Sequence, residues 1–163
     1  MRSAVLAALA VLTLASPVLT SPVLAAGDAT YVNSRFGYAI DRPADWVAEP
    51  EAENGDGRVF HPRGGAVRAA VWGAYNALDE SPAQIADRAA EDCHGAPLAY
   101  RVVKPALVAI SCKTGGRILY QKTLIRGDVL TSLRFTYPAA EAARWEPVLK
   151  RMAASMRAAS PAD

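Results

Sequence analysis

His61 and His94 are the two histidines of this sequence, and histidine is the residue type that acts most often as a catalytic base. A serine or cysteine nucleophile needs such a base beside it, and the G-x-S-x-G motif of many hydrolases does not occur. We therefore expect a non-enzymatic protein. The alternative is a small hydrolytic or metal-dependent enzyme that uses His61 with acids such as Asp41 or Asp56.

The segment 49–57 concentrates acidic side chains and could offer oxygen ligands to a calcium ion. The candidate ligands are Glu51, Glu53, Asn54 and Asp56. Their spacing matches no EF-hand loop, and the two glycines of the segment stand in turn dipeptides. No phosphate-binding loop occurs either. We predict an exposed acidic turn and expect no metal ion and no cofactor.

Two groups of residues are candidates for binding a ligand or a partner. One is a polar surface across two neighbouring strands, suited to hydrogen bonds with a partner backbone or an acidic group. The other is the end of a strand before the first helix, where a pocket could form. The alternatives are a solvated sheet face for the first group and, for the tryptophan of the second, a place in the core. The residues are Gln121, Thr123, Ser132 and Arg134 in the first group, and Trp72, Tyr75 and Asn76 in the second.

The polar group depends on a predicted hairpin that turns at Gly127 and Asp128. This turn sets Tyr120 opposite Phe135, Ile118 opposite Tyr137 and Leu124 opposite Thr131 on one face of the sheet. That face is predicted to be core. The other face sets Gln121 opposite Arg134 and Thr123 opposite Ser132, and it is mostly polar.

Two helices are expected to cover this sheet. Ser81 and Gln84 form a capping box for the first, which should stop at Gly95 and bury the stripe Ile85, Ala89 and Cys93. The second should span residues 139–158, kink or restart at Pro147, and cover the core face with the stripe Trp145, Leu149, Met152 and Met156.

Cys93 and Cys112 are the two cysteines of the chain, and an exported protein would pair them in a disulfide. A two-residue loop at the glycine pair 115–116 would place Cys112 opposite Leu119, on the polar face. The first helix would then lie on that face. A three-residue loop would place Cys112, and with it the first helix, on the opposite face.

Export is indicated by the first 25 residues, which combine Arg2, an apolar run from Ala4 to Ala15 and the small-residue cleavage signature 23–25. We predict a cleaved signal peptide over residues 1–25, with an uncleaved anchor as the alternative, and a periplasmic or secreted location. No cysteine stands at the cleavage point for a lipid anchor. Residues 26–163 should form one domain without a transmembrane span, and we expect a monomer. The 18 basic and 16 acidic residues nearly balance, so binding to nucleic acid is not expected.

The order of elements and several local strings resemble the PsbP/Mog-type α/β/α sandwich, especially small exported bacterial members of unknown function. The resemblance implies an α+β fold, an antiparallel β-sheet with helices on both faces. Because relatives include a photosystem accessory subunit, a Ran-binding protein and secretion adaptors, it also implies a binding or assembly module. The strings are residues 31–38, 43–46, 53–58, 71–76, 117–120 and 135–138.

Together these observations predict an exported, non-enzymatic binding or adaptor module. Its partner would be another envelope or secreted protein, or a small ligand. A third hypothesis is that the protein carries an apolar ligand between a helix and the sheet.

Overall fold

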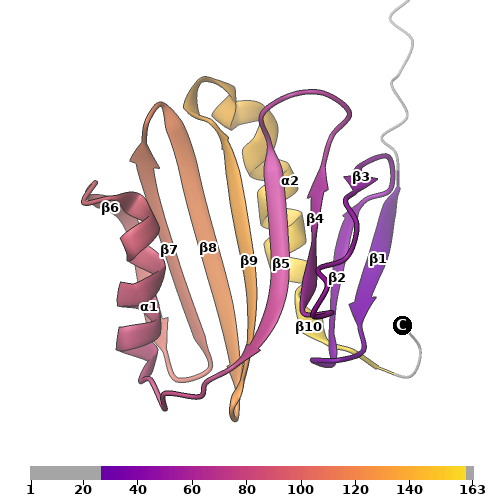
Figure 1. The fold of residues 1–163 in the computed structure, drawn as a ribbon. Helices are drawn as coiled ribbons and strands as arrows, with labels where there is room; N and C mark the ends of the chain where they lie inside the picture. The colour runs from indigo at the N-terminus through magenta and orange to yellow at the C-terminus, as the bar shows by residue number, and fades with distance from the viewer. Residues whose placement is uncertain (1–26, 161–163) are drawn as a thin grey trace, which may run out of the picture.

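The computed structural model describes residues 27–160, so the predicted signal peptide, residues 1–25, lies outside the described residues. The described chain forms an α+β fold with two α-helices and two antiparallel sheets (Figure 1). The larger sheet has seven strands in the order β3-β4-β5-β9-β8-β7-β6. Its strands are β3 (Val47–Ala48), β4 (Gly57–His61), β5 (Arg68–Tyr75), β6 (Leu98–Lys104), β7 (Leu107–Thr114), β8 (Arg117–Arg126) and β9 (Val129–Pro138).

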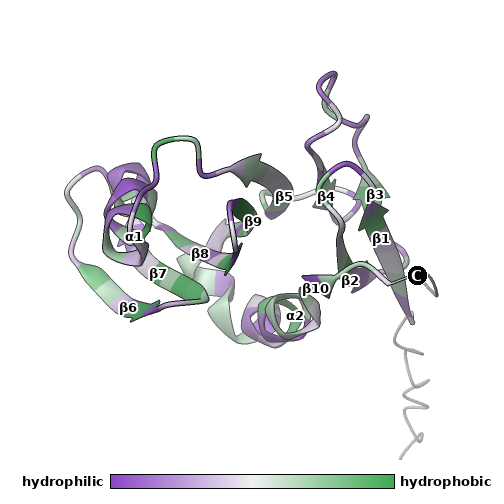
Figure 2. Ribbon diagram, turned by 90° about the horizontal axis from the view of Figure 1, so that it is seen from below, coloured by the Kyte–Doolittle hydropathy of each residue, from purple (hydrophilic) through white to green (hydrophobic). Residues whose placement is uncertain are grey.

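A second sheet of three strands, in the order β1-β2-β10, joins the two ends of the described chain. The helices lie on opposite sides of the large sheet (Figure 2). The remaining elements are β1 (Asp28–Asn33), β2 (Tyr38–Pro43), α1 (Pro82–Ala90), the 3₁₀ turn η1 (Glu91–Cys93), the 3₁₀ turn η2 (Ala139–Glu141), α2 (Ala142–Ser155) and β10 (Arg157–Ala158).

The central hairpin has the predicted register. Gly127 takes a φ of 61° in the turn between β8 and β9, a conformation that costs glycine no steric clash. Tyr120 lies opposite Phe135, and Gln121 lies opposite Arg134. Because side chains alternate along a strand, one register fixes both faces of the sheet.

The core face is covered by α2 and also by the small sheet. Trp145, Leu149 and Met152 of α2 pack with Phe135 and Tyr137 of β9. The same cluster contains aromatic and aliphatic side chains of the small sheet and its hairpin turn. They are Tyr31, Phe36, Tyr38 and Ile40.

Phe36 shows how closely the two sheets approach. A Cβ atom built on Gly73 of β5 would come within 2.3 Å of the Phe36 ring. Glycine is therefore required at this position of β5. Nothing in the sequence indicated that β1, β2 and β10 form a separate sheet on the α2 side.

The other face of the large sheet is covered by α1, as the position of Cys112 on that face predicted. Ser81 accepts a hydrogen bond from the backbone of Gln84, whose side chain accepts one from the Ser81 backbone, and Ile85 and Ala89 are buried. Cys93 and Cys112 form a disulfide with Cα atoms 6.0 Å apart. This confirms the predicted pairing and ties the end of the helical segment to β7.

Both helices end earlier than predicted. The first becomes a 3₁₀ turn after Ala90, and His94 and Gly95 then both take a positive φ, of 51° and 79°. The second ends at Ser155, whose hydroxyl accepts a hydrogen bond of 2.9 Å from the backbone N–H of Asp41 in β2. Residues 157–158 pair with β2 instead of continuing the helix.

Of the two outcomes predicted at Pro147, the restart is wrong, because α2 runs continuously across it, and the kink stays a prediction. None of the helices within residues 27–160 is long and apolar enough to cross a membrane.

Candidate functional site

A pocket of about 200 Å³ lies between the sheet and the segment formed by α1 and η1. Strands β5, β8 and β9 supply its floor, because their side chains alternate toward the α1 side at these positions. The floor contains five of the seven residues that the sequence singled out for binding. They are Trp72, Gln121, Thr123, Ser132 and Arg134.

The floor is polar but buried, which corrects the expectation of an open polar surface. Gln121, Thr123 and Ser132 are 7%, 1% and 5% exposed. The hydroxyl groups of Thr123 and Ser132 share a hydrogen bond of 2.8 Å across the two strands. Since this bond gives each hydroxyl a partner, the helix can cover this part of the sheet without leaving either one unbonded.

Arg134 is held in the pocket by three neighbours. Its Nε donates a hydrogen bond of 2.9 Å to Oε1 of Gln121. Its Nη2 forms an ion pair with Asp92 of η1. Its guanidinium carbon lies 5.4 Å from the centre of the Trp72 ring, a distance at which a cation and an aromatic face attract each other.

These contacts leave part of the guanidinium unused. Among the contacts of residues 27–160, Nη1 of Arg134 makes no hydrogen bond, although it carries two N–H groups. The side chain of Arg134 is 31% exposed, so a ligand in the pocket can reach it. The arrangement can therefore receive an oxygen acceptor at Nη1, with the apolar side chains of the pocket beside it.

The helix side of the pocket carries charges of both signs. Arg88 is paired with Glu80 at 2.7 Å, while Glu91 and Asp92 line the pocket from η1. The disulfide at Cys93 follows Asp92 directly, so it fixes the backbone that presents this carboxylate.

Arg88, Glu91 and Asp92, on the helix side of the pocket, were not among the binding residues predicted from sequence. The signal available in the sequence was the predicted disulfide, together with the placement of Cys112 on the polar face of the sheet. A helix whose last turn is tied to Cys112 of β7 must bring the residue before Cys93 over the neighbouring strands.

Tyr75 and Asn76 lie outside the pocket. Tyr75 is 57% exposed on the opposite sheet face, with its ring centre 5.2 Å from that of Phe36. The Asn76 side chain donates to the backbone oxygen of Glu80 at 2.9 Å and accepts from its N–H at 3.0 Å. Asn76 therefore orders the turn that leads into α1.

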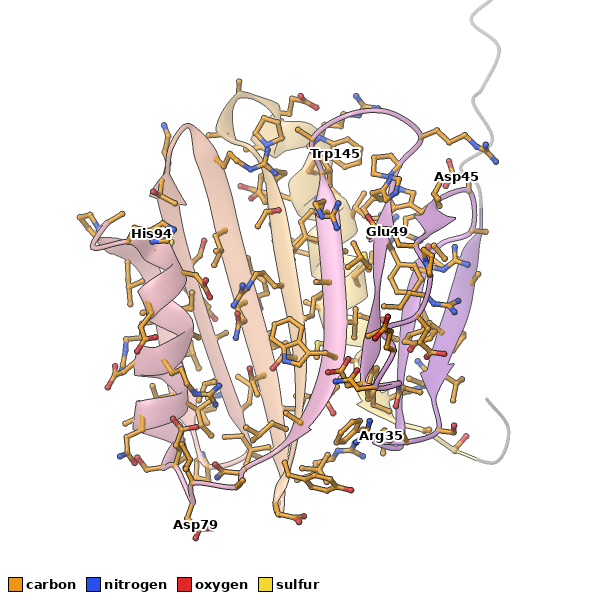
Figure 3. All side chains as sticks on the ribbon, in the orientation of Figure 1. Arg35, Asp45, Glu49, Asp79, His94 and Trp145 are labelled. Atoms are coloured by element: carbon orange, nitrogen blue, oxygen red, sulfur yellow. A yellow bond between two sulfur atoms is a disulfide. The ribbon has the colours of Figure 1, made fainter. Side chains whose placement is uncertain are left out.

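The structure does not bring the alternative catalytic residues together. Nδ1 of His61 lies 2.9 Å from its neighbour's carbonyl oxygen, and its Nε2 lies 3.7 Å from Glu49. Asp41 instead contacts Arg157, and Asp56 contacts Asn54. Figure 3 shows His94 at the α1 edge of the molecule and Glu49, the partner of His61, toward β4.

The acidic turn also fails to form a cation site. Glu51 accepts a hydrogen bond of 2.7 Å from Tyr31, and Asn54 donates one of 2.8 Å to Asp56. Within residues 27–160, no three His, Cys, Asp or Glu side chains gather closely enough to hold a metal ion.

Comparison with known proteins identifies the fold. No protein-family model matches the chain, and neither does the sequence of any curated protein. Among solved structures, the chain is similar to cyanobacterial PsbP (CyanoP) from Synechocystis sp. PCC 6803, with a TM-score of 0.60 and 13% identity over 85% of this chain and 96% of that one. The fold is PsbP-like.

Two other solved structures match the chain with lower scores. A protein from Bacteroides thetaiotaomicron VPI-5482 matches with a TM-score of 0.50 and 13% identity, over 85% of this chain and 50% of that one. LpqN of Mycobacterium tuberculosis, described as involved in cell envelope biogenesis, matches with a TM-score of 0.49 and 15% identity, over 82% of this chain and 91% of that one. At 13% identity, the match to cyanobacterial PsbP establishes a shared fold and not a shared function.

Proposed function

We propose that this chain is an exported, non-enzymatic binding or adaptor module of the cell envelope, and that it binds through the pocket beneath α1. The observation that carries the proposal is the convergence of five predicted binding residues on that pocket, where Arg134 keeps an unused donor. A disulfide is consistent with export, because such bonds persist in oxidising compartments. The PsbP-like fold supports the same interpretation, because the resemblance implies a binding or assembly module.

The chemistry of the pocket defines what it would accept. Nη1 of Arg134 favours a carboxylate or carbonyl oxygen, because guanidinium groups form strong hydrogen bonds with such acceptors. Trp72, Ile85 and Leu130 offer apolar contact beside it. A small molecule, or the side chain of an envelope protein, would meet both requirements if it carried an acidic group next to an apolar one.

The test compares two pocket variants with a matched surface variant. Arg134→Glu reverses the charge at the donor, and Ala74→Phe fills the pocket while leaving the Arg134 contacts in place. Arg63→Glu makes the same charge change on an exposed turn. Circular dichroism and thermal melts establish that each variant is folded.

Each tagged protein is incubated with envelope extract under non-reducing conditions, and the retained proteins and small molecules are quantified by mass spectrometry. We expect a component that the wild type and Arg63→Glu retain equally and that both pocket variants lose. Equal recovery by all four proteins would exclude this pocket as the binding site.

A further inference from the structure

A second hollow lies on the opposite face of the sheet, beside α2. The helix packs on β9 and β2, and it leaves part of β6, β7 and β8 uncovered (Figure 2). Two adjoining cavities of about 420 Å³ and 290 Å³ occupy this place and share four lining residues, so they form one groove. Cavities of this size are typical of small-molecule sites. The shared residues are Tyr100, Tyr120, Lys150 and Ala153.

The groove follows from the order of side chains across three strands. Ser111 of β7 lies between Tyr100 of β6 and Tyr120 of β8. Two residues along the strand, Ala109 lies between Val102 and Lys122 in the same way. Small side chains on the middle strand, with larger ones on both neighbours, leave a trough along β7.

The trough is lined mainly by apolar and aromatic surface. Tyr100 is 48% exposed, although aromatic side chains usually bury most of their surface. Burial raises the pKa of Tyr120, and the nearby Tyr100 raises it further, so the Tyr120 ring stays neutral at ordinary pH. Tyr137 and Leu149 continue the lining toward one end of the groove.

The two ends of the groove differ in charge. Lys122 lines only one of the two cavities and Glu146 only the other, while Lys150 lines both. Nζ of Lys122 donates a hydrogen bond of 2.5 Å to the backbone oxygen of Ala153. Burial lowers the pKa of this lysine, and within residues 27–160 it forms no ion pair with a carboxylate. A half-buried cation without a counter-charge is costly, and a bound anion would remove that cost.

We propose that this groove binds a soluble single-chain amphiphile with an anionic head group. The head lies against Lys122 and Lys150, and the apolar chain follows the trough past Ser111 toward Leu149, away from the head-group end. Because the groove and the pocket beneath α1 lie on opposite faces of the sheet, this inference does not depend on the proposed function of that pocket.

Isothermal titration with dodecanoate, below its micelle concentration, tests the proposal. Dodecyltrimethylammonium reverses the head-group charge, and butyrate removes most of the chain. We expect saturable binding of dodecanoate and of neither control ligand. Absence of saturable binding, or equal binding of the cationic amphiphile, would overturn the proposal.

Variants locate the site. Lys122→Met keeps the length of the side chain and removes its charge, so dodecanoate affinity should fall about tenfold or more, as expected for a hydrogen bond to a charged group. Ser111→Phe should abolish binding by filling the trough. Lys113→Met changes an exposed lysine of β7, the strand that carries Ser111, and should leave binding unchanged. Unchanged affinity in folded Lys122→Met and Ser111→Phe would place the amphiphile elsewhere and refute the assignment.

Two further measurements distinguish this groove from the other surfaces that an amphiphile could occupy. Ala74→Phe, which fills the pocket beneath α1, should bind dodecanoate as the wild type does, and loss of binding would refute the placement beside α2. Co-sedimentation with phosphatidylglycerol vesicles should show no binding. Vesicle binding without binding of monomeric dodecanoate would identify the groove as a membrane-docking surface and overturn the proposal.

Discussion

Removal of the disulfide is the perturbation whose effect the structure defines most directly. The double substitution Cys93→Ala and Cys112→Ala opens a loop with a sequence separation of 19. In the chain-entropy model, opening such a loop lowers the free energy of unfolding by about 3 kcal/mol. Alanine is preferred over serine, because both positions are buried and a hydroxyl there would lose its hydrogen bonds to water.

The expected loss of stability translates into a melting temperature. Unfolding entropies of globular proteins scale with chain length, and for a domain of this size 3 kcal/mol corresponds to about 10 °C. Differential scanning calorimetry on the wild type and the double variant measures the difference. Reductant should lower the melting temperature of the wild type to that of the variant and should leave the variant unchanged.

The same variant tests whether the bridge positions Asp92. Amide hydrogen exchange in η1 should accelerate in the variant, because the 3₁₀ turn would be held only by its packing and by the ion pair with Arg134. A melting temperature within about 3 °C of the wild type would refute the reasoning. It would mean that the unfolded chain gains little freedom when the bridge is removed.

Three other predictions concern the core and the first helix. Gly73→Ala should cost about 1–3 kcal/mol in urea unfolding, because its Cβ would collide with the aromatic ring packed on it, whereas Gly27→Ala meets nothing and should be neutral. Burial raises the pKa of Tyr38 above 10.0, so the folded chain keeps a proton that the unfolded chain releases above about pH 10, and stability falls there. Tyr38→Phe should reduce that fall between pH 9 and pH 11, as the urea midpoint measures it, and an unchanged fall in this variant would contradict the reasoning. Ser81→Ala should lower the free energy of unfolding by about 1 kcal/mol by removing the cap of α1; no change in the urea midpoint would show that the cap is dispensable.

The parts of the fold that could be predicted from sequence are those that local rules determine. The turn at Gly127 fixes the register of β8 and β9, and alternation then assigns each side chain to a face. The glycine pair at 115–116 fixes β7 against β8 in the same way, which placed Cys112 and therefore α1. One register error at either turn would have exchanged the two faces.

The parts that could not be predicted depend on contacts between distant segments. Residues 157–158 continue the pattern of polar and apolar side chains of the helix before them. Only β2, far away in the sequence, provides a partner that favours a strand. The burial of Gln121 and Thr123 depends on where α1 crosses the sheet, which the hairpin alone does not specify. Tyr75 and Asn76 were grouped with Trp72 because they are adjacent in sequence, but alternation turns Tyr75 to the other face, and Asn76 lies beyond the strand.

The position of β2 between β1 and β10 also determines when the fold can be completed. The hydrogen bond between Asp41 and Ser155 joins residues that are 114 positions apart, so β2 keeps one open edge until residues 155–158 have been synthesised. Contacts of such long range form late and slow the folding of a domain. A chain that is cut short before Ser155 would keep that edge unpaired beside an apolar surface. This is the geometry from which strands of different molecules associate, so the pairing of β10 with β2 protects the protein against aggregation.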